Sequence, residues 1–141
     1  MILKTGFILI WLISIPALSQ VEELKLKPFT SDGCSVFPDG TITQNKLWLA
    51  CCTAHDFAYW KGGTYSDRLD ADLLLRDCVA KLGKPEIALL MFAGVRAGGT
   101  PFLPSTFRWG YGWQYPRFYG PLTENELEQV EKLTKKASGS R

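Results

Sequence analysis

The only histidine of the chain, His55, lies in a segment that concentrates reactive side chains, LWLACCTAHDFAYWKGGTYSDR. An α-helix has about 3.6 residues per turn, so Cys51, His55 and Tyr59 are expected on one stripe of its surface. Cys52 and Asp56 share the neighbouring stripe. One helix is therefore expected to present a general base, an anionic ligand and two points for cross-links side by side.

A second helix is predicted over Asp67–Leu82, after a Gly-Gly turn. Two helices joined by so short a turn are expected to lie antiparallel and in contact. Asp72 then lies opposite the stripe of His55 if the register is fixed, and a Cys51–Cys78 disulfide would fix it. The offsets from the two cysteines correspond to roughly 6 and 9 Å along the helices, at about 1.5 Å per residue.

This arrangement predicts an acid–base function for His55. Asp72 would accept a hydrogen bond from one imidazole nitrogen, which leaves the other nitrogen free to act as a general base toward water. Tyr59, on the same stripe, would hold the Asp72 carboxylate. A lone histidine on a helix is most often structural, so the prediction depends on these neighbours occurring together.

Asp56 is the candidate metal ligand, because it points beside the His55 pair toward a loop rich in turn-forming residues, SDGCSVFPDG. Carboxylate and carbonyl oxygens suit a hard cation, which indicates calcium. Asp32 and a backbone carbonyl near Gly33 are the further candidate ligands. A Cys34–Cys52 disulfide would hold the loop against the helix, one turn from Asp56. Taken singly, each aspartate is better explained by a helix cap or a solvated charge, and the metal interpretation depends on the cysteines that would hold both together.

The first residues have the pattern of a secretory signal peptide, residues 1–19. Lys4 gives a positive start, Phe7–Ile15 is almost wholly apolar, and Ala17-Leu18-Ser19 is a small-x-small cleavage site. The apolar run is well short of the roughly 20 residues that span a bilayer, although an uncleaved anchor is the alternative. We therefore expect an exported protein, secreted or periplasmic.

Export and the even number of cysteines, four, predict two disulfides, for which three pairings are possible. A tetrahedral zinc site is disfavoured, because the chain has one histidine and an oxidising compartment would remove its thiolates. Vicinal Cys51-Cys52 is also a poor redox pair, since a bridge between adjacent residues is strained.

The 141-residue chain is long enough for one domain, residues 20–137, followed by a disordered tail, residues 138–141. Loss of Lys4 with the signal peptide lowers the formal net charge from +2 to +1, and no basic stripe remains to indicate a nucleic-acid partner. No alternating run is long enough to predict a sheet, although Val21–Lys27 could be an arm or a short strand. We expect an all-α monomer.

The remaining helices follow from local signals. Thr43 or Asn45 is expected to cap the first helix and Ser66 the second. A third helix, Glu86–Ala97, is apolar nearly all round, so we expect it to be buried or membrane-facing. A capping box, Thr123–Glu126, begins the last helix.

The irregular segment Gly98–Pro121 carries eight aromatic residues: Phe102, Phe107, Trp109, Tyr111, Trp113, Tyr115, Phe118 and Tyr119. In the simpler interpretation they cover the apolar third helix. In the other they form an interfacial surface, because Trp and Tyr favour the headgroup region of a membrane.

The helix motif as a whole resembles that of the secreted phospholipase A2 superfamily. The matching residues are Cys51, Cys52, His55, Asp56 and Tyr59, followed by Asp72 and Cys78. The loop Asp32-Gly33-Cys34-Ser35 through Pro38-Asp39 is similar to the calcium loop of the bacterial members. The resemblance covers about a third of the chain and implies an all-α fold in which a disulfide-linked antiparallel helix pair carries the active site beside an ordered calcium-binding loop.

The resemblance also implies a function, calcium-dependent hydrolysis of the sn-2 ester of glycerophospholipids at a membrane surface. His55 would activate water, Asp72 would orient it, and Tyr59 would support Asp72. Asp56 would bind calcium with Asp32 and the Gly33 carbonyl. The family suggests the same two disulfide pairings.

Two other interpretations compete with the enzyme. The same scaffold could be a catalytically inactive module that binds lipid or a protein partner. A structural envelope protein is the third, but it leaves the combination of His55, Asp56 and Asp72 unexplained. A silent relative need not retain all three residues, so their combination favours the enzyme.

Overall fold

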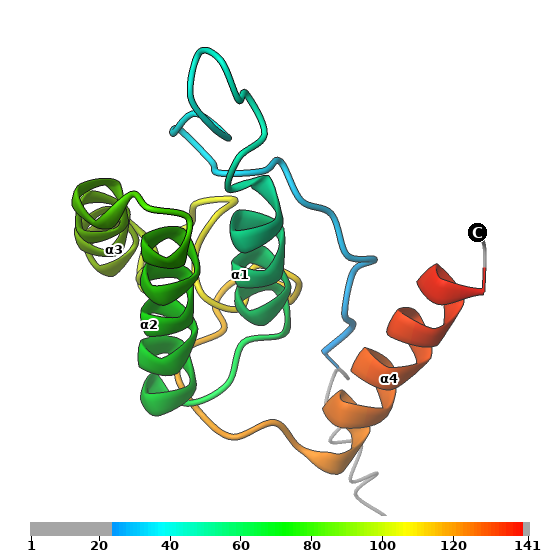
Figure 1. The fold of residues 1–141 in the computed structure, drawn as a ribbon. Coiled ribbons are helices and arrows are strands. Elements are labelled where there is room, and N and C mark those ends of the chain that lie inside the picture. Colours follow the sequence, from blue (N-terminus) through cyan, green and yellow to red (C-terminus); the bar gives the residue numbers. More distant parts are fainter. Residues whose placement is uncertain (1–23, 140–141) are drawn as a thin grey trace, which may run out of the picture.

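The computed structural model describes residues 24–139, which contain four α-helices (Figure 1). The helices are α1 (Leu49–Lys61), α2 (Tyr65–Lys81), α3 (Pro85–Gly98) and α4 (Glu124–Ser138). No strand occurs between residues 24 and 139, which confirms the all-α class for this part of the chain. The predicted signal peptide, residues 1–19, and residues 140–141 of the predicted tail lie outside the described residues.

Three of the helices form the main core, with α2 between α1 and α3 (Figure 1). A disulfide between Cys51 on α1 and Cys78 on α2 joins the first two helices. A second disulfide, Cys34–Cys52, ties the loop before α1 to that helix. The four cysteines thus form the two predicted disulfides, and such cross-links are typical of proteins from an oxidising compartment.

The start of α2 differs from the prediction. The hydroxyl of Thr64 accepts a hydrogen bond from the Asp67 N–H (3.1 Å), and the Asp67 carboxylate accepts one from the Thr64 N–H (2.8 Å). This capping box satisfies two backbone donors at once, and α2 therefore begins at Tyr65. The predicted cap at Ser66 is wrong, because that residue already lies inside the helix.

Of the other predicted helix caps, one is confirmed and one is wrong. α1 begins at Leu49 without a side-chain cap, so neither Thr43 nor Asn45 caps it. The predicted capping box of α4 is confirmed, with Thr123 and Glu126 bonded reciprocally. The helix continues to Ser138, the first residue of the predicted disordered tail.

α3 is not buried on all sides. Ala88 and Met91 face the core, whereas the side chains of Leu89 and Leu90 are 61% and 59% exposed. Of the two predicted alternatives, burial on all sides is wrong, because only one stripe of this helix contacts α2 and α1. The other alternative, a membrane-facing surface, stays a prediction.

The aromatic segment closes the end of α1. The indole N–H groups of Trp109 and Trp113 donate to the carbonyls of Gly63 (2.9 Å) and Lys61 (2.7 Å). Lys61 is the last residue of α1, and its carbonyl has no partner within the helix, so the Trp113 bond replaces a contact with water. The Gly63 carbonyl lies in the turn that follows. Two backbone N–H groups of the same segment donate to the carbonyls of Tyr59 and Trp60. We call residues 108–113 the clamp.

Backbone contact within the clamp requires glycine. Gly62, at φ +70°, ends α1, and a Cβ there would lie 3.1 Å from the Cα of Gly110. A Cβ on Gly112 would lie 2.5 Å from the Trp60 ring. The buried tryptophans of the aromatic segment therefore pack against the end of α1, rather than simply covering α3.

α4 lies apart from the three-helix core and packs on the N-terminal arm (Figure 1). Residues 24–27 are extended and form no strand; the N–H of Leu26 donates to the Gln129 side chain (2.9 Å). Val130 and Leu133 pack on the cluster of Leu26, Trp60 and Trp113. Among residues 24–139 no helix is both long enough and apolar enough to span a membrane.

Candidate active site

His55 and Asp72 form a buried pair between α1 and α2. The Nε2 atom of His55 lies 2.8 Å from Oδ1 of Asp72, and the Tyr59 hydroxyl donates to the same oxygen at 2.8 Å. The Asp72 side chain is fully buried, and His55 is 8% exposed. The structure therefore brings together the three residues that the sequence assigns to acid–base chemistry.

The helical register places this pair. Cys51 and Cys78 have Cα atoms 5.8 Å apart, and this fixed point lies one turn before His55. Asp72 precedes Cys78 on the opposed helix by the offset predicted from the sequence. Tyr59 follows His55 by one turn, with the two rings 4.2 Å apart between centroids, so both rings face the same carboxylate.

Two arginines complete the environment of Asp72, and the sequence did not predict either. Arg96 Nη1 on α3 donates to Oδ2 of Asp72 at 2.6 Å. Arg68 Nε on α2 lies 3.8 Å from Oδ2 and donates to the Tyr59 hydroxyl at 3.0 Å. The four-residue spacing of Arg68 and Asp72 was a usable signal. The contact of Arg96 with Asp72 could not be predicted, because it depends on how α3 packs on α2 and no sequence pattern indicates that packing.

Asp72 is ionised in this environment. Burial alone would raise the pKa of its carboxyl group, but hydrogen bonds from His55, Arg96 and Tyr59 outweigh burial and hold the pKa below its usual value. A carboxylate that stays ionised can accept the imidazole N–H and stabilise a positive charge that develops on the ring.

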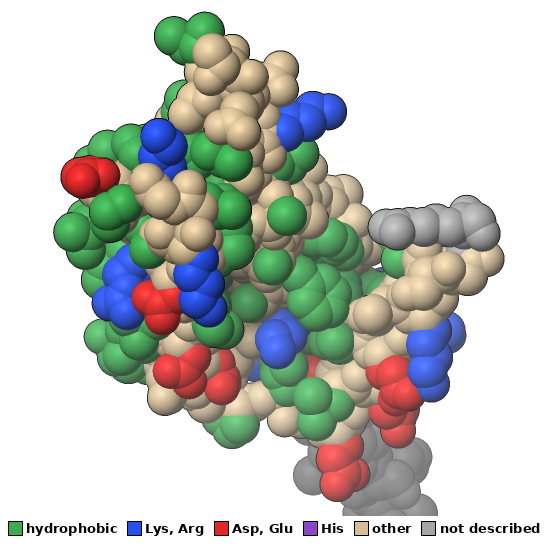
Figure 2. Space-filling view, in the orientation of Figure 1, with side chains coloured by type: hydrophobic (Ala, Val, Ile, Leu, Met, Phe, Trp, Pro, Cys, Tyr) green, Lys and Arg blue, Asp and Glu red, His purple; other side chains and the backbone are tan. Residues whose placement is uncertain are grey.

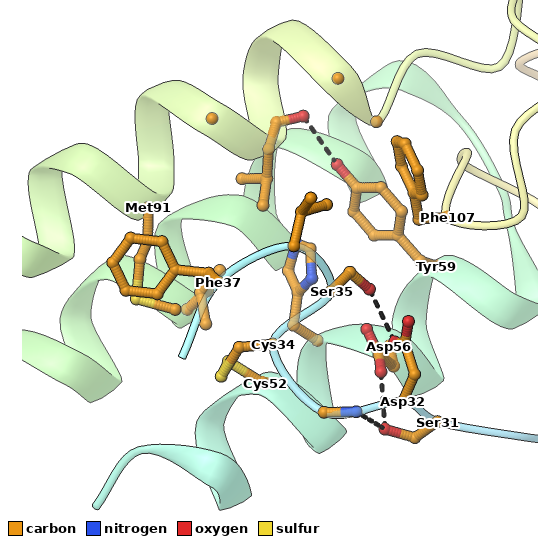
Figure 3. A pocket seen from close by; sticks show the side chains of 18 of the residues that line it. Ser31, Asp32, Cys34, Ser35, Phe37, Cys52, Asp56, Tyr59, Met91 and Phe107 are labelled. Atoms are coloured by element: carbon orange, nitrogen blue, oxygen red, sulfur yellow. Dashed lines mark hydrogen bonds between the residues drawn. A yellow bond between two sulfur atoms is a disulfide. The ribbon is translucent and has the colours of Figure 1, made fainter. Parts of the chain in front are cut away.

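Asp56 lies beside the loop that the Cys34–Cys52 disulfide holds in place (Figure 3). One oxygen of Asp56 accepts a hydrogen bond from the Ser31 hydroxyl at 2.6 Å. Asp32, on the same loop, bonds to the Ser35 hydroxyl at 2.7 Å. Each carboxylate thus accepts a hydrogen bond from a serine hydroxyl of the loop.

The charge around Asp56 is unbalanced. Burial raises the pKa of its carboxyl group to about 6; the Ser31 hydrogen bond and His55 oppose this rise, whereas Asp32 and Asp39 increase it. Among the described residues, no lysine or arginine lines the surrounding pocket. An added cation would therefore relieve both the burial and the repulsion.

Gly33 is required by the loop that carries Asp32. Its φ is +80°, and a Cβ would lie 2.4 Å from Oδ1 of Asp39. That same oxygen accepts a hydrogen bond from the Cys34 N–H at 2.8 Å. Asp39 therefore shapes the loop, a role that the sequence did not assign to it. Within residues 24–139, no three His, Cys, Asp or Glu side chains come together as a metal-binding group.

A pocket of about 750 Å³ opens between α1, α3 and the loop (Figure 3). His55, Asp32 and Asp56 line its polar part. The apolar part is lined mainly by Phe37, Leu90, Met91, Val95 and Phe107. At Gly94 and Gly98 the α3 wall lacks side chains, and a Cβ at Gly94 would meet nothing within 4 Å.

Exposed apolar side chains surround part of the pocket. Val36 and Phe107 both line it and are 97% and 40% exposed, and Leu90 on α3 belongs to the same rim. Figure 2 shows hydrophobic side chains gathered over the side of the molecule on which α3 lies.

No protein-family model, curated protein or solved structure matches this chain.

Proposed function

We propose that the protein is a calcium-dependent phospholipase A2 of the secreted, bacterial type that hydrolyses the sn-2 ester of glycerophospholipids. The observation that carries this proposal is the buried His55–Asp72 pair, with 2.8 Å between Nε2 and Oδ1, beside a large apolar pocket. The unbalanced carboxylate next to His55, Asp56, supports a cation at the same place.

In this proposal His55 is the general base. Its Nε2 faces an ionised carboxylate and therefore carries the proton, which leaves Nδ1 as the acceptor for a proton from water. Asp72 fixes this tautomer and stabilises the imidazolium that forms after proton transfer. Tyr59 supports Asp72 by donating to the oxygen that His55 uses. The α1–α2 pair is then the disulfide-linked unit that carries the active site.

The donor set at the loop fits calcium. Asp56 and Asp32 would provide carboxylate oxygens, the Gly33 carbonyl a backbone oxygen, and water the remaining positions, because calcium prefers oxygen ligands. Residues 31–39 are then the calcium-binding loop. Calcium held by these residues would polarise the ester carbonyl and stabilise the developing oxyanion.

The pocket supports a lipid substrate. Its volume of about 750 Å³ and its apolar lining suit an acyl chain, while His55 and Asp56 stand at its polar part. The exposed rim that includes Val36 and Leu90 would contact the membrane surface that presents the substrate. With its disulfides, such an enzyme is expected to be exported, secreted or periplasmic.

The test is release of fatty acid from phosphatidylcholine vesicles. We expect release with calcium, none with a chelator, and none for His55→Gln in either condition. Glu128→Gln serves as the matched control, since it replaces an exposed carboxylate of α4, outside the pocket. Activity that persists with chelator and in H55Q would refute the mechanism. Vesicle binding without hydrolysis would favour the inactive binding module.

A further inference from the structure

We infer that Arg96 is a positioning residue for the His55–Asp72 pair. It holds the second oxygen of Asp72, so that the first oxygen stays directed at the imidazole. This inference rests on the proposed function, because it assigns a role to Arg96 within the same reaction. It also extends the site to α3, to which the sequence assigned no part in the chemistry.

The donors around Asp72 divide between its two oxygens. Oδ1 accepts from His55 and Tyr59, each at 2.8 Å. Oδ2 accepts from Arg96 Nη1 at 2.6 Å, and the other nearby cation, Arg68 Nε, lies at 3.8 Å. A carboxylate can rotate about its Cβ–Cγ bond, so bonds to one oxygen do not fix its plane. The short bond from Arg96 to the other oxygen fixes it.

Arg96 is itself held from its outer side. Its Nη2 atom donates to the Tyr65 hydroxyl at 3.0 Å, and its guanidinium carbon lies 5.2 Å from the centroid of the Tyr65 ring. The two contacts use different parts of the planar guanidinium, which lysine cannot reproduce. The carbonyl of Arg96 also accepts from Arg68 Nη2 at 2.8 Å, which fixes the end of α3 against α2.

The two arginines differ in what they support. Arg68 is 3% exposed and donates to two tyrosine hydroxyls and to two carbonyls at the end of α3, so its removal would disturb several elements. The side chain of Arg96 is 21% exposed and, among residues 24–139, donates only to Asp72 and Tyr65. Substitution of Arg96 therefore separates orientation of Asp72 from general folding.

Arg96 also links orientation to charge. With a neutral imidazole, two guanidinium groups face one buried carboxylate, and this excess keeps Asp72 ionised inside the protein. An ionised and correctly rotated Asp72 holds the proton on Nε2 of His55. Without Arg96, we expect Asp72 to rotate and the imidazole to populate both tautomers.

The experiment compares Arg96→Met with Arg96→Lys and uses Arg76→Met as the matched control. Arg76 also lies over an aromatic ring, that of Phe92, but it pairs with exposed Asp77 and not with Asp72. Kinetics use a monomeric short-chain phospholipid with calcium, so that kcat and KM are separated from binding to a membrane. The ¹⁵N spectrum reports the tautomer of the single histidine without needing activity.

We expect R96M to lower kcat by up to about 100-fold with little change in KM, the loss that a misplacement of about 1 Å can cause. R96K should recover part of kcat, and R76M should match wild type. The ¹⁵N spectrum should show the Nε2–H tautomer in wild type and R76M, and a mixture in R96M.

Unchanged kcat and an unchanged tautomer in R96M would overturn the inference. If R96M fails to fold, R96K and Tyr65→Phe decide: wild-type kcat and tautomer in both would overturn it, and a lower kcat with mixed tautomers in either would support it. If wild type releases no fatty acid, the proposed function fails, while the tautomer comparison still decides whether Arg96 positions the pair.

Discussion

Replacement of Asp56 by Asn should stabilise the calcium-free protein. Burial raises the pKa of the Asp56 carboxyl group to about 6, so near neutral pH the ionised form is present at a cost in free energy of unfolding. Asparagine has nearly the same shape and can still accept the hydrogen bond from Ser31. The substitution therefore removes the charge and leaves the contact.

The magnitude follows from the pKa. A rise from 3.8 to about 6 corresponds to roughly 3 kcal/mol at 1.36 kcal/mol per pKa unit. Asp56 is only partly buried, and solvent screening reduces this to about 1 kcal/mol. For a domain of this size, we expect D56N to melt about 4 °C higher than wild type.

The sign of the pH dependence is also fixed. The folded state binds the Asp56 proton more tightly than the unfolded chain does, so this contribution to stability is complete below pH 3.8 and is lost as the pH rises to about 6. Between these pH values the free energy of unfolding of wild type should fall because of Asp56, whereas D56N has no titrating group at this position and should not show this fall. The difference in melting temperature between the two proteins should therefore grow across this interval.

The assay is thermal unfolding followed by circular dichroism, first with chelator and then with calcium, with E128Q as the control. Calcium at about 100 times its dissociation constant should stabilise wild type by roughly 2.7 kcal/mol and D56N by far less. Wild type would then become the more stable protein. If D56N melted below wild type in chelator, the cost assigned to the buried charge of Asp56 would be refuted. If calcium stabilised both proteins equally, the assignment of Asp56 as a cation ligand would be refuted.

Three further predictions concern the pocket, the buried pair and the clamp. Gly94→Leu should narrow the pocket and reduce hydrolysis of long-chain more than short-chain phospholipids, with exposed Ala93→Leu on the same helix unchanged, as measured by fatty-acid release. Asp72→Asn should lower the free energy of unfolding by about 3 kcal/mol near neutral pH, because two arginines lose their partner. Since hydrogen bonds lower the pKa of Asp72, the deficit should shrink as the pH falls through the acid range in urea titrations. Trp109→Phe should cost about 1 kcal/mol in the same titration, because the Gly63 carbonyl loses one of its two donors and keeps the Gly120 N–H; no loss would contradict the proposed role of the clamp.

The part of the site that could be predicted from sequence depends on short-range periodicity. Cys51, His55 and Tyr59 share a stripe on any helix that includes them, and the cysteine offset then placed Asp72 without knowledge of the fold. The error at the start of α2 has a local cause, since Thr64 with Asp67 forms a stronger capping signal than a lone serine.

Contacts between distant segments could not be predicted in the same way. Arg96 reaches Asp72 only because α3 packs beside α2, and one arginine in an apolar helix gives no indication of its partner. The clamp tryptophans donate to backbone carbonyls, and any residue can provide such an acceptor. The pattern of aromatic residues therefore showed that the segment was important but not what it contacts.

The clamp makes the order of synthesis relevant to the site. The Lys61 carbonyl accepts a hydrogen bond from the indole of Trp113, which lies 52 positions later in the chain. The hydrogen bond from Trp109 to Gly63 spans 46 positions. A nascent chain contains α1 with its histidine and its carboxylate long before it contains the donors for the end of that helix. The final turn of α1, which includes Tyr59, thus acquires its remaining partners only late in synthesis, and a chain truncated before residue 109 would leave that turn open to water.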